Sequence, residues 1–137
     1  MYKTLKPFDI VTSPYVSING TTKRFENGDV QKGLFLVLAV DYFGITCAKI
    51  TSQSNSLYLT HSVILYKYTN PFLRTDSYVQ LDKLHTLSAE TATYVGFVDK
   101  AARLTICNTL EGYFSSVTQN LRRFCVPHNG YISPNLK

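Results

Sequence analysis

The sequence predicts a mainly β domain: a small SH3-like barrel of strongly bent antiparallel strands, with a C-terminal helix. The chain of 137 residues has the length of one domain. Its ten Tyr and eight Phe favour strands. Short apolar runs between turn dipeptides give way to helical spacing only near the C-terminus. We expect one domain over 1–137, with the barrel at about 7–98, the helical part at about 99–124 and a loose tail at 125–137.

The N-terminal region predicts one strand and a long polar segment. The strand covers Phe8 to Thr12, between Pro7 and Pro14. The polar segment, Ser13 to Gln31, has room for a hairpin centred on the turn dipeptide Asn19-Gly20. A loop of this length inside a compact domain is usually functional or mobile.

The middle of the chain predicts the remaining strands. Gly33 to Val40 shows no polar alternation, so we expect both of its faces to be covered. The strand Ile45 to Thr51 follows, and a polar loop begins at Ser52. Further along we expect strands at His61–Tyr68 and Ser77–Asp82, an extended piece at Leu84–Thr86, a helical turn at Ser88, and a strand or a connection at Tyr94–Val98.

The C-terminal third has helical periodicity. Asp99 is placed to cap the start of this helical region. Asn108 together with Glu111 could instead cap a second, separate helix. The apolar residues that recur every three or four positions are Cys107, Leu110, Phe114, Val117, Leu121 and Phe124.

Charge and cysteine content narrow the function classes. The formal net charge of +5 favours a polyanionic or acidic partner. The three Cys are widely spaced without a CxxC pair, which argues against a zinc site and against a disulfide framework. The apolar run Leu34–Val40 is far shorter than a membrane-spanning helix, and the N-terminus lacks the pattern of a signal peptide. We therefore expect a cytoplasmic protein with no membrane association, metal or cofactor.

Four segments resemble the MazF/PemK toxin family. Phe8-Asp9-Ile10-Val11 is similar to the family's "GDIV" opening. Lys32–Leu38 and Lys49–Gln53 are similar to its "RPVLVV" and "PITSQ" strands. Asp76–Thr86 is similar to its "DSxVxxDQxRT" stretch. The order and the spacings also match.

The resemblance implies a fold, an activity and partners. The fold is the small barrel shared with the gyrase poison CcdB, in a cytoplasmic homodimer. The activity is that of a toxin that cuts single-stranded RNA at short sequences, without metal, through the neighbouring 2′-hydroxyl. The implied partners are the RNA and a cognate antitoxin, whose acidic segment would cover a basic groove.

The resemblance also implies catalytic residues. Metal-free cleavage needs a base, an acid and donors to the phosphate. Thr51 matches a phosphate-binding Thr, and Asp82 matches a base of the PemK branch. Lys32 and His85 each occupy a position where the family has Arg, and they are the other two catalytic candidates. Gln80, two residues before Asp82, would share its face in a strand and also replaces a family Arg.

The remaining candidates concern binding. We expect phosphate or base contacts from Lys23, Arg24, Lys49, Ser52 and Gln80. His61 is a second histidine that could move a proton. Because Gln cannot replace the charge of Arg, and Lys lacks its bidentate fork, two alternatives stay open. One is an altered effector on this fold that binds a host protein such as DNA gyrase. The other is a nucleic-acid-binding module, for RNA or DNA, without cleavage.

Overall fold

The computed structural model describes residues 4–13, 15–18, 21–24, 33–42, 44–52 and 61–124, with the backbone alone for 15–18 and 21–24. The described strands are β1 (Asp9–Ser13), β2 (Tyr15–Ile18), β3 (Thr21–Arg24), β4 (Gly33–Asp41), β5 (Gly44–Thr51), β6 (Ser62–Leu65), β7 (Ser77–Gln80), β8 (His85–Leu87) and β9 (Thr93–Phe97). They are followed by helices α2 (Lys100–Glu111) and α3 (Ser115–Leu121) and the 3₁₀ helix η1 (Arg122–Phe124). The predicted mainly β class is confirmed.

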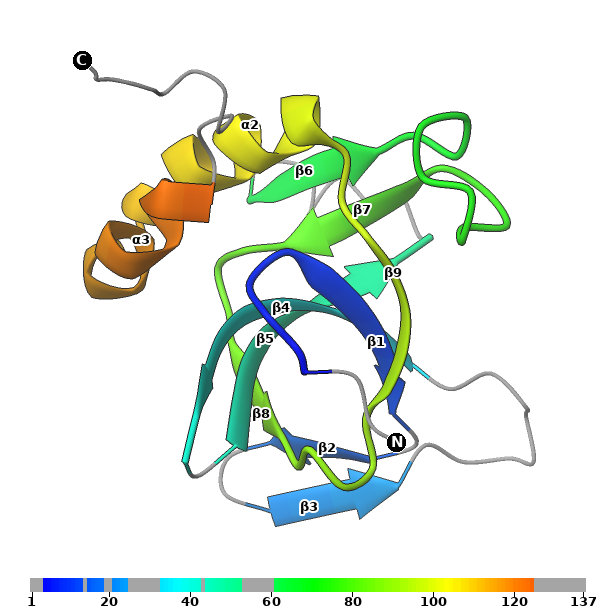
Figure 1. Ribbon diagram of the computed structural model, residues 1–137, viewed down its shortest axis with the longest axis vertical. Helices are drawn as coiled ribbons and strands as arrows, with labels where there is room; N and C mark the ends of the chain where they lie inside the picture. The colour runs from blue at the N-terminus through cyan, green and yellow to red at the C-terminus, as the bar shows by residue number, and fades with distance from the viewer. Residues whose placement is uncertain are drawn as a thin grey trace.

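Seven strands form one antiparallel sheet in the order β6-β7-β5-β4-β1-β9, with β8 also paired to β5. β5 pairs with β7 through Ile50 and Thr51, and with β8 through Ile45 to Cys47. A bulge interrupts the β4–β5 pairing between Val37 and Ala39, and such bulges bend and twist a strand pair. Figure 1 shows β4 and β5 curving across the molecule.

The sheet has a separate apolar core on each face. This agrees with the prediction that both faces of the strand at Gly33 to Val40 are covered. In β4, Leu36 and Leu38 belong to the larger core, whereas Phe35 and Val37 belong to the smaller one. We call these the helix-side core and the far-side core. The far-side core also contains Val11, Ile45, Cys47 and Leu87.

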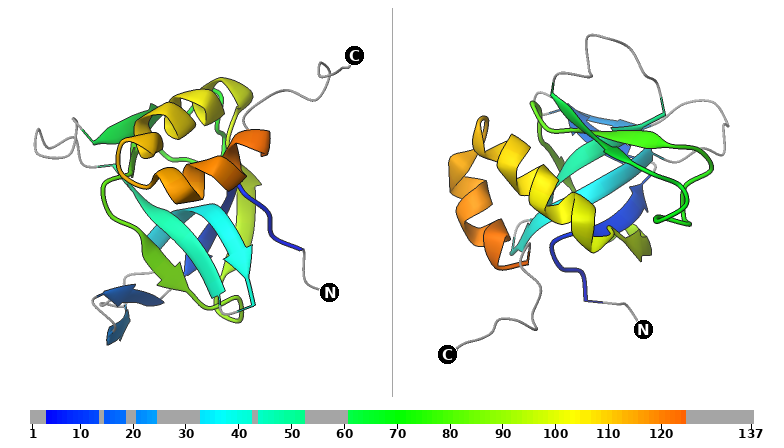
Figure 2. Two further views of the ribbon diagram at one scale, coloured as in Figure 1. Left: turned by 90° about the vertical axis from the view of Figure 1, so that its left-hand side faces the viewer. Right: turned by 90° about the horizontal axis from the view of Figure 1, so that it is seen from above.

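The helices cover only the helix-side core. Ile106, Leu110 and Leu121 are buried in it, and Figure 2 shows both helices lying across one end of the sheet. The predicted cap at Asp99 is confirmed, since its carboxylate accepts a hydrogen bond of 3.2 Å from the backbone N–H of Ala102. The region forms two separate helices, which was one of the two alternatives expected from the sequence. The second helix, α3, starts at Ser115.

Asn108 and Glu111 therefore do not cap the second helix. Both residues lie inside α2, which continues to Glu111. Their side chains instead meet Arg122, which is hydrogen-bonded to Asn108 and ion-paired with Glu111. The capping pattern was ambiguous because the same residue types also serve a helix–helix contact.

Several element bounds differ from the prediction because turns interrupt the apolar pattern. β6 ends at Leu65, since Tyr66 O accepts backbone hydrogen bonds from Thr69 and Asn70. β7 ends at Gln80, not Asp82. The segment after Ser88 is a turn without a helix, and Thr93–Phe97 is a strand paired with β1.

The other predicted elements are close to those observed. The hairpin expected around Asn19-Gly20 exists as β2 and β3, although its turn lies outside the described residues. The expected loop at 53–56 and the expected tail at 125–137 also lie outside them. No helix in the described part of the chain is long and apolar enough to span a membrane.

The expectation that the cysteines form no disulfides is wrong. Cys107, buried in the helix-side core, forms a disulfide bond, and Cys47 is free. The bonding partner of Cys107 lies outside the described residues. Since disulfides persist mainly in oxidising compartments, the cytoplasmic expectation loses one of its arguments.

Candidate functional site

A set of polar side chains lies on the face of β5, β6 and β7 that points away from the helices. Ile50, Val79 and Val63 are aligned across these three strands, and all three belong to the helix-side core. Because side chains alternate along a strand, the neighbouring residues point to the opposite face. Lys49 pairs with Phe35 on β4, and Phe35 belongs to the far-side core. This confirms that Lys49 faces away from the helices.

We call this set the polar patch, and define it by five residues: Lys49, Thr51, Ser62, Tyr78 and Gln80. Thr51 is aligned with Tyr78, and Ser62 with Gln80, so the patch extends over three neighbouring strands. All five residues are partly exposed. Three of them, Lys49, Thr51 and Gln80, were chosen from the sequence, and the register now places them together.

The patch combines hydrogen-bond donors with one positive charge. Hydroxyl groups come from Thr51, Ser62 and Tyr78, an amide from Gln80 and an ammonium group from Lys49. Donors of this kind can hold an anionic phosphodiester and stabilise the charge that develops on it. The patch contains no carboxylate or imidazole, so a proton carrier has to come from outside it.

Asp82 stands beyond the strand that carries the patch. Leu81 is buried in the helix-side core, and Asp82 follows it in an exposed bend between β7 and β8. The strand alternation that placed Asp82 on the same face as Gln80 does not extend to it, because β7 ends at Gln80.

His85 lies on the same face of the sheet but away from Thr51. It is aligned with Cys47 on β5, four residues before Thr51. At about 3.3 Å of rise per residue, this separates the two positions by about 13 Å. The His85 ring packs edge-on against Phe35, with 6.2 Å between ring centroids. His85 therefore borders the far-side core.

The other predicted residues are not brought into the patch by the described structure. Ser52 is exposed and directly follows Thr51. Lys23 and Arg24 lie on β3, where only the backbone is described, and Lys32 lies outside the described residues. The hairpin that carries Lys23 and Arg24 lies against β8 through its other strand, β2.

The His61 side chain is on the helix side of the sheet, the face opposite the polar patch. Its Nδ1 shares a short hydrogen bond with the hydroxyl of Tyr113, and the two rings meet edge-on at 5.4 Å. Tyr113 follows α2. His61 thus ties the start of β6 to the helices and does not border the patch.

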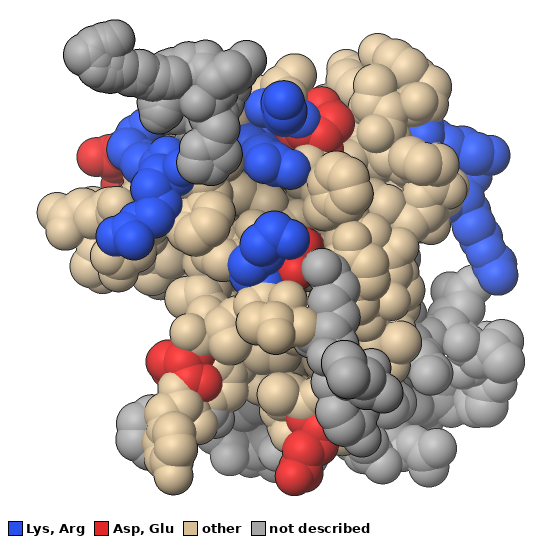
Figure 3. Space-filling model, viewed as in Figure 1, with Lys and Arg blue, Asp and Glu red and all other residues tan. Residues whose placement is uncertain are grey.

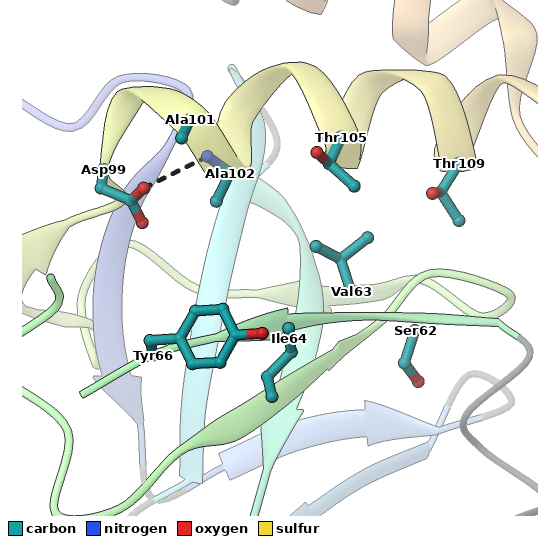
Figure 4. Close-up of a pocket in the computed structure, with 9 residues that line it drawn as sticks. All are labelled: Ser62, Val63, Ile64, Tyr66, Asp99, Ala101, Ala102, Thr105 and Thr109. Carbon is teal, nitrogen blue, oxygen red and sulfur yellow. Dashed lines mark hydrogen bonds between the residues drawn. The ribbon is translucent and has the colours of Figure 1, made fainter. Parts of the chain in front are cut away.

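A groove that sequence reasoning missed runs between β6 and α2. Its volume is about 370 Å³. Figure 4 shows Val63 pointing toward α2, with Ser62 and Ile64 on the other side of β6. Asp99, at one end, is already engaged with Asn70 and Ala102. The lining residues are Ser62, Val63, Ile64, Tyr66, Asp99, Ala101, Ala102, Thr105 and Thr109.

Sequence reasoning also missed Ser62 and Tyr78. The signal was present for Tyr78, because it is two residues before Gln80 and therefore on the same face of a strand. Ser62 carried no such signal, since only the β6–β7 register brings it to Gln80.

Positive charge is not confined to the patch. On the view of Figure 3, Lys and Arg side chains gather over the helices at the upper left, and others lie at the right-hand edge. Neither the protein-family models nor the curated proteins compared with this chain match it. The resemblance to MazF/PemK toxins therefore rests on the four quoted segments.

Proposed function

We propose that this protein is a metal-independent endoribonuclease that cuts single-stranded RNA at short sequences, as a toxin of a toxin–antitoxin pair. One observation carries the proposal. Lys49, Thr51 and Gln80 come from two motifs that are far apart in the sequence, yet they meet on one face of neighbouring strands. The bend in β5, which pairs with both β7 and β8, supports the finer proposal of a small SH3-like barrel.

In the proposed reaction, the 2′-oxygen attacks the adjacent phosphorus and the bond from phosphorus to the 5′-oxygen breaks. A base accepts the 2′-proton, an acid protonates the leaving 5′-oxygen, and the products carry a 2′,3′-cyclic phosphate and a 5′-hydroxyl. Lys49 and the Thr51 hydroxyl bind the non-bridging oxygens, where negative charge grows in the transition state. Asp82 and His85 are the two candidates for proton transfer.

The test is incubation of the purified protein with mixed single-stranded RNA in the presence of EDTA. We expect cleavage with cyclic-phosphate ends, reduced about 100-fold or more by Thr51→Val. Thr46→Val is the matched control, because Thr46 lies on the same strand but on the other face. Asp82→Asn and His85→Gln show which residue carries the proton. RNA that stays intact at an excess of wild-type protein would overturn the proposed cleavage.

A second candidate function is single-stranded nucleic-acid binding without cleavage. It is favoured by the position of His85, about 13 Å along β5 from Thr51, and by the exposed bend that holds Asp82 outside the patch. Salt-dependent binding of intact RNA, with no products, would select this function.

The partners follow from the same proposal. An acidic antitoxin segment suits a chain with a formal charge of +5, and we propose that the toxin acts as a homodimer. A short acidic reading frame beside this gene, whose product suppresses the cleavage, is the expected finding.

A further inference from the structure

Tyr78 lies directly across from Thr51 on the neighbouring strand. The register aligns Thr51 with Tyr78, and Tyr78 in turn with Ile64 on β6. Side chains opposed in this way have their Cβ atoms about 4.5–5.5 Å apart. The partly exposed Tyr78 ring therefore begins beside the Thr51 hydroxyl.

Two more tyrosines follow β6, the last strand at this edge of the sheet. Tyr66 is 42% exposed and Tyr68 is 80% exposed. Their ring centroids are 5.5 Å apart and the rings are tilted by 35°. Aromatic rings gain free energy from burial, so two exposed neighbours form a surface suited to binding. Lys67, between them, is also exposed.

Tyr78 belongs to a row of residues that crosses the strands, and Tyr66 lies beside the β6 end of that row. Thr51, Tyr78 and Ile64 share the face opposite the helix-side core. Figure 4 shows Tyr66 lying along β6, and both Tyr66 and Ile64 border the same groove. Neighbouring strands are about 4.8 Å apart, so the row from Thr51 to Ile64 is about 10 Å long.

We propose that Tyr78, Tyr66 and Tyr68 form a stacking track for the unpaired bases of single-stranded RNA. The proposal rests on the proposed function, since it adds base contacts to the phosphate contacts of Lys49 and Thr51. The flat face of a tyrosine stacks on any base, and proteins hold single strands by alternating such rings with cationic groups. The RNA then crosses β5, β7 and β6, and Lys67 lies where a phosphate would pass.

The experiment measures binding separately from cleavage. The probe is a fluorescein-labelled, mixed-sequence oligoribonucleotide whose 2′-hydroxyls are methylated, so that it cannot be cut. Its affinity is measured by anisotropy over a range of salt concentrations for wild type, Tyr78→Leu, Tyr66→Leu, Tyr68→Leu and Lys49→Ala. Tyr42→Leu, on the β4–β5 turn at 93% exposure, is the matched control.

Stacking and phosphate contacts predict different signatures. Each track variant should weaken binding roughly 5- to 100-fold and leave the salt dependence unchanged, because a base contact releases no counterions. Tyr78→Phe should restore binding. Lys49→Ala should reduce the slope of log affinity against log salt by about 0.7, and Tyr42→Leu should behave as wild type.

The outcomes separate this inference from the proposed function. In one outcome, Lys49→Ala changes the slope of log affinity against log salt, but the tyrosine variants bind as tightly as wild type. The stacking track is then wrong, and the proposed phosphate site at Lys49 and Thr51 remains. If wild type does not bind the probe at any salt concentration, both fall. Because Tyr66 and Tyr68 are exposed, their variants keep the test valid even if Tyr78→Leu does not fold. If those variants bind RNA normally but lose binding to a protein, the tyrosines form a protein interface and the inference is overturned.

Discussion

Cys47 is a thiol placed in an apolar environment at the centre of the far-side core. Burial raises its pKa from 9.0 to about 12, because the thiolate would lose its hydration. The thiol donates to the carbonyl oxygen of His85 at 3.5 Å, which fixes the start of β8 against β5. Although Cys47 lies near the patch, its chemistry is that of an inert core residue.

We predict that the contribution of the Cys47 thiol to the free energy of unfolding decreases at alkaline pH. The pKa is higher in the folded than in the unfolded state, so the contribution of Cys47 is complete below about pH 9. It is lost as pH rises from about 9 toward about 12, by at most about 1.4 kcal/mol per pH unit.

The measurement is urea unfolding from pH 8 to 11. Tyrosines and lysines also titrate in this range, so the informative quantity is the difference between wild type and Cys47→Ala. That difference should shrink with rising pH. A difference independent of pH would show that the thiol is not buried as described.

At the scale of elements, Asn70 links the β6–β7 connection to the start of α2. It is fully buried. Its Nδ2 donates to Tyr66 O and to Asp99 Oδ1, both at 2.9 Å, and its Oδ1 accepts from the backbone N–H of Asp99 at 3.2 Å. Asp99 in turn caps α2.

The Phe72 ring leaves no space for a side chain at Gly96 in β9. A Cβ added at Gly96 would be 2.8 Å from Cδ2 of Phe72.

We predict that Asn70→Ala lowers the free energy of unfolding by about 2–3 kcal/mol, since it leaves buried polar groups without their partner. Asn120→Ala, at an exposed position on α3, should stay within about 0.5 kcal/mol of wild type. Chemical denaturation measures both. Equal effects of the two substitutions would contradict the linking role of Asn70. Because Tyr66 belongs to the same turn, Asn70→Ala should also weaken binding of the methylated RNA.

At the scale of the whole molecule, the disulfide at Cys107 adds a covalent restraint to the helix-side core. Such bonds stabilise small domains by about 2–4 kcal/mol.

The net charge of +5 also acts at the scale of the whole molecule, since it favours association with any polyanion before a specific contact is made.

We predict a defined thiol count for the chain, which has three cysteines. A thiol reagent should find none in the native protein, because Cys47 is buried. It should find one after denaturation without reductant, and three after reduction. Reductant should lower the free energy of unfolding by about 2–4 kcal/mol. Three reactive thiols in the unreduced, denatured chain would disprove the bond.

The sequence alone determined the mainly β class, the two-sided burial of β4, the cap at Asp99 and the choice of Lys49, Thr51 and Gln80. The class, the burial and the cap follow from local physics: periodicity reports which face is buried, and capping depends on residues three positions apart. The three candidate residues came instead from the resemblance to the MazF/PemK family. Only the tertiary structure decided that Thr51 meets Tyr78, that Ser62 joins Gln80 and that Cys107 forms a disulfide. It also placed Asp82 in a bend and His85 beside Phe35. Strand register joins residues far apart in the chain, and no local pattern encodes that alignment.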